Sequence, residues 1–247
     1  MIKLVDTSLP DTHFAEDFVG AKIYANYLAY GTGFSFSTFW VQCCKDTVTA
    51  VINKFENTIF IAADSTADIT ELKDFCEIIG FYFIQADAEL LFKMGYENIS
   101  EYAVLNYENE ITPKTETKIP MPNLKTVYDI LFFEDISTLI KPSWEGWYAD
   151  LSHRIRHGAA VAFCDENAAL VFSHITDNSA IISGVSVLPK SRKNGIGSKL
   201  LSRSIASVSR RNVFACADFK TASFYIKNGF TITKKLGIHT AKEIKYD

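Results

Sequence analysis

Several features that would mark a specialised class of protein are missing from this chain of 247 residues. None of its five cysteines (43, 44, 76, 164 and 216) stands in a C-x-x-C pair, so no zinc or redox motif is present. We therefore expect buried, reduced cysteines, as in a cytoplasmic protein. The net charge is only −4, which offers no overall attraction to nucleic acid or to an anionic membrane.

Long apolar runs are missing as well. No run is long enough to cross a bilayer, and residues 1–6 lack the apolar core of a signal peptide. We therefore expect a soluble, cytoplasmic protein. Its apolar content of 48% is enough for a packed core, and its length suits one large domain or two modest ones.

Proline is scarce, and half of it gathers in one place. Pro113, Pro120 and Pro122 lie in a polar stretch that is typical of a linker. This places a first domain at 1–112, a linker at 113–125 and a second domain at 126–247. In the first domain the patterns predict one or two helices within the first thirty residues, then strands at 34–41, 48–53, 58–63, 81–84 and 102–106, with helices at 69–79 and 88–94.

The second domain follows a similar plan. Apolar spacing predicts helices at 126–140 and 144–157, strands at 159–164, 169–174, 180–187, 213–217 and 230–233, and further helices after 195 and at 220–228. A strand, a short helix and a Gly-aromatic pair close both halves, ending at Tyr96 and at Phe230. We therefore predict two related halves.

A basic, glycine-containing loop joins the 180–187 strand to a helix. In Pro189-Lys-Ser-Arg-Lys-Asn-Gly-Ile-Gly197, the glycines let the main chain approach a ligand, and the helix start presents free N–H groups to an anion. A dinucleotide fingerprint needs a third glycine where Leu200 stands, and no P-loop run occurs. The pattern predicts a bound phosphate group; a solvated basic turn is the alternative.

The pattern Pro-x-x-Arg-x-x-Gly-x-Gly resembles the acyl-coenzyme A pyrophosphate loop of the GNAT superfamily of N-acetyltransferases. Downstream, Phe224-Tyr-Ile-Lys-Asn-Gly-Phe230 resembles the family's (Leu/Phe)-Tyr-x-x-x-Gly-Phe signature, in family order and at family spacing. The resemblance covers about residues 126–245. It implies an α/β (α+β) fold with a mixed, mostly antiparallel central sheet flanked by helices, here in two tandem copies with a degenerate first copy.

The resemblance also implies a site and a reaction. Acetyl-CoA would lie between the splayed 180–187 and 213–217 strands, and a small-molecule or peptide amine would attack its thioester without a metal. Tyr225 occupies the position of the family's general acid. The residues implied to bind the cofactor are Val185, Val187, Leu188, Arg192, Lys193, Asn194, Gly195, Ile196, Gly197 and Ser198.

Two departures leave alternatives open. The position of the family's catalytic glutamate holds Ile181, so the base lies elsewhere, is water or is absent, with Glu145 and His153 as candidates. The family's cofactor-contacting asparagine is replaced by Asp218. A non-catalytic acyl-CoA sensor or interaction module is therefore the alternative to an enzyme. The acceptor and the oligomeric state stay open.

Overall fold

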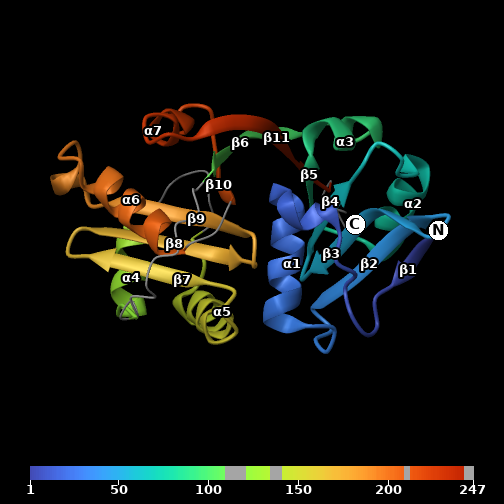
Figure 1. Cartoon of the computed structure of the whole chain (residues 1–247), viewed down its shortest axis with the longest axis horizontal. Helices are drawn as coiled ribbons and strands as arrows, with labels where there is room; N and C mark the ends of the chain where they lie inside the picture. Colours follow the sequence, from blue (N-terminus) through green and yellow to red (C-terminus); the bar gives the residue numbers. More distant parts are fainter. Residues whose placement is uncertain (109–120, 134–140, 209–211, 242–247) are drawn as a thin grey trace, which may run out of the picture.

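The computed structural model describes residues 1–108, 121–133, 141–208 and 212–241. Within these ranges the strands form one sheet in the order β1-β2-β3-β4-β5-β11-β6-β10-β9-β8-β7 (Figure 1). The strands are β1 (Ile2–Leu4), β2 (Ser37–Cys44), β3 (Thr47–Phe55), β4 (Thr58–Ala63), β5 (Phe83–Asp87), β6 (Ser100–Glu108), β7 (Val161–Asp165), β8 (Ala168–Ile175), β9 (Ser179–Val187), β10 (Asn212–Ala217) and β11 (Thr231–Thr240).

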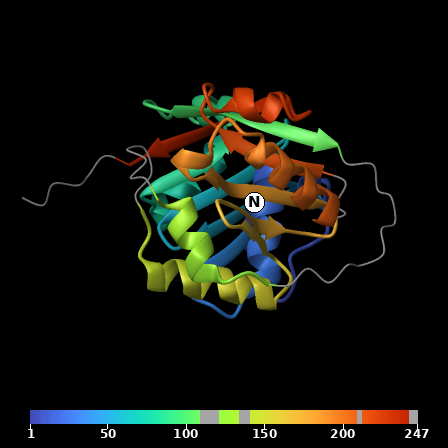
Figure 2. The same ribbon diagram turned by 90° about the vertical axis from the view of Figure 1, so that its left-hand side faces the viewer.

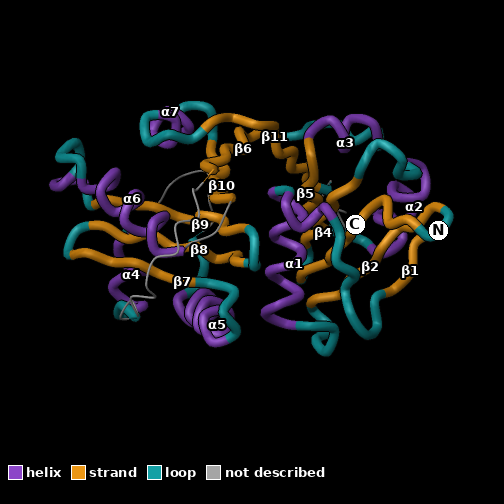
Figure 3. The backbone as a smooth tube through the Cα atoms, in the orientation of Figure 1, coloured by secondary structure: helices purple, strands orange, loops and turns teal. Residues whose placement is uncertain are grey.

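Helices cover both faces of this sheet, as Figure 3 shows. They are the 3₁₀ helix η1 (His13–Glu16), α1 (Phe18–Tyr30), α2 (Ile69–Ile79), α3 (Ala88–Lys93), α4 (Leu124–Leu131), α5 (Trp144–Arg156), the 3₁₀ helix η2 (Pro189–Ser191), α6 (Ile196–Val208) and α7 (Ala222–Ile226). The sheet is mixed and mostly antiparallel, with parallel pairing only of β4 with β5 and of β9 with β10 in the described ranges. The predicted fold class is confirmed.

Local sequence signals account for many element ends. The side chain of Asp68 accepts a hydrogen bond from the Glu71 N–H at 3.0 Å and so caps α2. Gly80 ends the same helix with a φ of 68°, a conformation that glycine adopts most readily. The capped helix predicted at 69–79 is therefore confirmed at both ends.

The two halves exchange their last strands. β6 belongs to the first half but lies between β10 and β11, antiparallel to both. β11 ends the second half but lies between β6 and β5. Figure 1 shows this pair bridging the halves, and Figure 2 shows it along one side of the molecule. The sheet therefore runs across the boundary that the sequence places between two domains.

Several predicted ranges need correction. The last strand was expected at 230–233, but β11 continues to Thr240 because it pairs with two strands of the first half. The helix expected at 220–228 is shortened to α7, and the one expected at 126–140 is formed as α4 over 124–131. Residues 113–120 of the predicted linker and residues 134–140 lie outside the described ranges. Leu124 and Lys125, the end of that linker, already belong to α4.

Helix α1 lies between the two halves of the sheet (Figure 1). It contacts β4 and β5 of the first half and β8 and β9 of the second. Its residue Phe18 meets Phe214 of β10 edge-on, with ring centroids 6.0 Å apart, in a core that also includes Ile181. An element of the first half thus covers the strands that frame the predicted site.

The cysteines are less buried than the sequence predicts. The cysteines are all free, but only Cys76 is fully buried and Cys44 is exposed, so the expected burial is wrong for most of them. No helix within the described ranges is both long enough and apolar enough to cross a membrane.

Candidate cofactor and catalytic site

Strands β9 and β10 separate beyond a short parallel segment. Their pairing begins at Ser179 and Asn212 and ends at Ile182 and Ala215. β9 then continues to Val187 while β10 continues to Ala217, without further pairing between them. The carboxyl ends of the two strands therefore form an opening at the position that the sequence predicts.

The loop after β9 presents main-chain donors to this opening. Lys193 and Gly195 have φ values of 64° and 73°, which turn the chain before α6 begins at Ile196. The N–H groups of residues 193–198 have no hydrogen-bond acceptor within the described part of the chain. Together with the positive end of the α6 dipole, they form a site suited to an anion.

A cavity of about 610 Å³ lies beside these donors. It contains no acidic side chain, and its lining residues are Val185, Ser186, Val187, Ser191, Arg192, Lys193, Gly195, Ile196, Gly197, Ser198, Thr221 and Phe224. Most of the predicted cofactor-binding residues are therefore brought together. Leu188 and Asn194 do not line the cavity, and the Leu188 N–H donates instead to the Asn167 carbonyl at 2.9 Å.

The shape of the cavity depends on close packing around Gly197. A Cβ atom there would lie 3.3 Å from Val187 Cγ2 and 3.5 Å from the ring of Phe224. The glycine therefore lets β9, α6 and α7 come together around one opening. Phe224 lines the cavity, although the sequence indicates it only as part of the family signature and not as a residue of the site.

The side chain of Asp218 closes the turn that leads into α7. Its carboxylate accepts hydrogen bonds from the Lys220 and Thr221 N–H groups, both at 2.9 Å, and from the Thr221 hydroxyl at 2.7 Å. The hydrogen bonds from Thr221 are the main cause that holds the pKa of this carboxyl below its usual value. The carboxylate that replaces the family's asparagine is thus used to hold α7 in place.

Tyr225 does not line this cavity, although its neighbour Phe224 does. It is 5% exposed and packs between Phe224 and Phe230, with ring centroids 5.2 and 5.4 Å away. Its hydroxyl makes no hydrogen bond with any described residue. Burial, and to a lesser extent the nearby Cys216, raises the pKa of Tyr225 above its usual value. The phenol is therefore neutral at physiological pH and able to donate.

The two candidate bases lie away from this cavity. Glu145 is exposed in the first turn of α5. His153 stacks on Tyr30, with centroids 4.7 Å apart, and its Nε2 lies 2.8 Å from the Ala29 carbonyl, to which it must donate. His153 lines a separate, aromatic cavity that shares no residue with the one at the loop. The structure does not bring either candidate to the loop.

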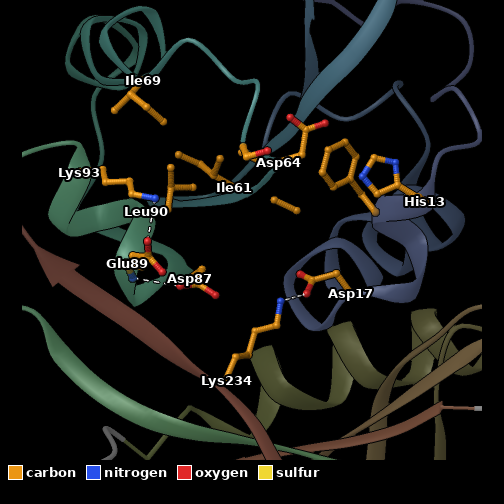
Figure 4. Close-up of a pocket in the computed structure, with 14 residues that line it drawn as sticks. His13, Asp17, Ile61, Asp64, Ile69, Asp87, Glu89, Leu90, Lys93 and Lys234 are labelled. Carbon is orange, nitrogen blue, oxygen red and sulfur yellow. Dashed lines mark hydrogen bonds and ion pairs between the residues drawn. The ribbon is translucent and has the colours of Figure 1, made fainter.

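The first half has an opening at the corresponding place. β4 and β5 also pair in parallel only as far as Phe60 and Gln85, and a cavity of about 530 Å³ follows. Figure 4 shows Asp64, Asp87 and Glu89 around it. Asp64 accepts hydrogen bonds from the N–H and the hydroxyl of Thr66, which closes the loop on itself. Such carboxylates repel phosphate, so this opening is not suited to an anion.

Comparison with known families assigns this arrangement to a class. Residues 147–232 match the family model described as an acetyltransferase (GNAT) domain. The matched range runs from α5 to the start of β11 and includes the loop and Tyr225. This part of the chain therefore matches the GNAT acetyltransferase family model, in agreement with the two motifs. A comparison with curated protein sequences finds no significant match.

Solved structures share the whole architecture. A GCN5-related N-acetyltransferase from Sphaerobacter thermophilus is similar with a TM-score of 0.54 and 14% identity, over 94% of this chain and 97% of that one. An acetyltransferase from the GNAT family from Colwellia psychrerythraea has a TM-score of 0.50 and 10% identity, over 98% and 100%. At these identities the likeness concerns the fold, and it extends to both halves.

Proposed function

We propose that the second half binds acetyl-CoA and transfers its acetyl group to a primary amine of a small molecule or peptide. The observation that carries this proposal is the cavity at the β9–α6 loop, where unpaired N–H groups of residues 193–198 meet a helix N-terminus and basic side chains. The pyrophosphate would lie on these donors. The pantetheine arm would follow β9 past Val187 and Val185 toward the point where β9 and β10 separate.

The chemistry needs few groups once the two reactants are aligned. The amine nitrogen attacks the thioester carbonyl, and a main-chain N–H near Val187 would stabilise the oxyanion. The C–S bond then breaks, and Tyr225 would donate a proton to the departing thiolate. The hydroxyl of Tyr225 suits this task because it is protonated and has no partner among the described residues.

A non-catalytic acyl-CoA sensor is the second candidate. It is favoured by Ile181, which is apolar and 2% exposed at the position of the family's base. The lining of the loop cavity contains no carboxylate, which also favours a sensor over an enzyme. Both functions require cofactor binding, and only the enzyme consumes the thioester.

Calorimetry with coenzyme A and a thioester assay separate these candidates. The acceptors tested would be an aliphatic amine, an amino acid, an aminoglycoside and a peptide with a free N-terminus. We expect binding of coenzyme A, and thioester consumption with at least one amine.

Lys193→Glu should weaken coenzyme A binding at least about tenfold, because it places a carboxylate at the anion site. Lys227→Glu, an exposed site on α7 away from the cavity, is the matched control. Binding without turnover would support the sensor, and absence of binding would remove both.

A further inference from the structure

His174 lies beside the position where the base is missing. In the antiparallel pair of β8 and β9, His174 is directly opposite Ile181. A bulge at Ser173 sets this register, because Phe172 pairs with Ile182 and the next residue to pair is His174. Side chains opposite one another lie on the same face of a sheet. The imidazole therefore shares the face of Ile181, on which α1 packs.

The two nitrogens of this imidazole differ in their hydrogen bonding. Nδ1 lies 2.7 Å from the Ser173 hydroxyl oxygen. Nε2 has no hydrogen-bond partner among the described residues, and the side chain is only half-buried. When Nδ1 carries the proton and donates it to Ser173, Nε2 has a free lone pair.

The surroundings keep the ring neutral. Burial is the main cause, and the cations Arg154 of α5 and Lys22 of α1 add to it, so that the pKa of His174 is well below its usual value. Arg154 is held by Asp150 at 2.9 and 3.0 Å and by Asn26 at 2.9 Å. Arg154 cannot act as a base, since guanidinium groups stay protonated.

The other titratable groups on this face are less suited to accept a proton. Burial lowers the pKa of Lys22, but its Nζ donates to the Gln85 side chain at 3.2 Å and lies 4.7 Å from the Phe18 ring centroid, and both contacts favour the cation. Cys216 of β10 interacts with Lys22, and burial raises the pKa of its thiol. Of the groups named, His174 alone offers a ring nitrogen that has no hydrogen-bond partner among the described residues.

We propose that His174 takes the proton from the acceptor amine, in place of the carboxylate that Ile181 lacks. This inference rests on the proposed function. As the amine nitrogen forms its bond to the thioester carbon, its proton passes to Nε2 of His174. The C–S bond breaks, and the thiolate receives its proton from Tyr225. Ser173 is then a positioning residue that holds the ring through Nδ1, and α1 of the first half covers the face on which this proton transfer occurs.

Turnover of His174→Gln tests this assignment with any amine that the wild-type protein acetylates. We expect coenzyme A binding within twofold of wild type and a kcat lowered by about a hundredfold or more, as for loss of a general base. His157→Gln, at the exposed histidine that follows the end of α5, should leave both unchanged. Free imidazole should restore part of the turnover of His174→Ala, which a purely structural role would not allow.

The outcomes separate the inference from the function on which it rests. A wild-type protein that consumes no thioester with any amine would remove the proposed function, and the inference with it. An active wild type with equal turnover of His174→Gln would overturn the inference alone. The inference would also be overturned if free imidazole did not change the turnover of His174→Ala. A loss of turnover in His174→Gln together with a loss of coenzyme A binding would overturn it as well.

Discussion

The hydroxyl of Tyr225 can be removed with little structural cost. It makes no hydrogen bond with a described residue, so Tyr225→Phe leaves no partner unsatisfied and keeps the ring between Phe224 and Phe230. We expect turnover to fall by more than about tenfold, since the thiolate would leave without its acid. Coenzyme A affinity and the midpoint of urea unfolding should stay at wild-type values. Unchanged turnover would exclude Tyr225 as the acid.

Gly195 is required by the conformation of the loop. Its φ of 73° is strained for any residue with a Cβ, although the space around it is open. Gly195→Ala should therefore cost about 1–2 kcal/mol, and coenzyme A affinity should fall about tenfold if the loop relaxes away from the anion-binding conformation. Gly33→Ala is the control, because no atom lies within 4 Å of a Cβ there and its φ is not left-handed. Calorimetry of both variants would decide, and equal affinities would contradict the expectation.

The depressed pKa of His174 also predicts a dependence of stability on pH. The unfolded chain binds a proton at this histidine near pH 6.5, whereas the folded protein does not until a much lower pH. The free energy of unfolding should therefore decrease as the pH falls below about 6.5. Urea unfolding between pH 5 and 8 would show a smaller decrease for His174→Gln. Parallel curves for the two proteins would contradict the pKa shift.

At the scale of elements, α1 depends on one carboxylate at its start. Asp17 accepts from the Val19 N–H at 3.0 Å and pairs with Lys234 of β11, so it joins α1 to a strand of the second half. Asp17→Ala should lower the free energy of unfolding by about 1–2 kcal/mol, as cap and ion pair are both lost. Asp17→Asn keeps a capping oxygen and should cost less. Equal urea midpoints for the two variants would show that the cap contributes nothing.

Elements with local signals could be predicted from the sequence. The capping of α2 by Asp68, its end at Gly80 and the loop from Pro189 to Gly197 all depend on neighbours in the chain. The family match at residues 147–232 agrees with the predicted class. The length of β11 could not be predicted, because its partners β5 and β6 lie more than a hundred residues away.

The position of His174 opposite Ile181 could have been predicted from the sequence. A hairpin turn at 176–179 places residue 175 opposite 180, and so His174 opposite Ile181. The register that follows from this turn places His174 beside Ile181, the position at which the family has its glutamate. What the sequence could not supply was its surroundings, because Lys22 and Arg154 reach it from helices distant in the chain.

At the scale of the whole molecule, the exchange of β6 and β11 makes each half depend on the other. Ala103 and Leu105 of β6 are fully buried in the core of the second half, beside Phe230. β6 pairs with β10 over residues 212–217 and with β11 over residues 231–238. The second half therefore lacks its middle strand when the first half is removed, and two unpaired edges face solvent.

We therefore expect a fragment of residues 121–247 to lose both cooperative unfolding and coenzyme A binding. Its β10 and β11 would have no partner between them, and Tyr225 and Phe230 would lose part of the core that holds them. Co-expression with a fragment of residues 1–120 should restore both properties, because it supplies β6 and the α1 that packs against Phe214. Urea unfolding followed by circular dichroism, with calorimetry for the cofactor, would measure each. A fragment of residues 121–247 that unfolds cooperatively and binds coenzyme A like the full chain would show that the second half needs no strand from the first.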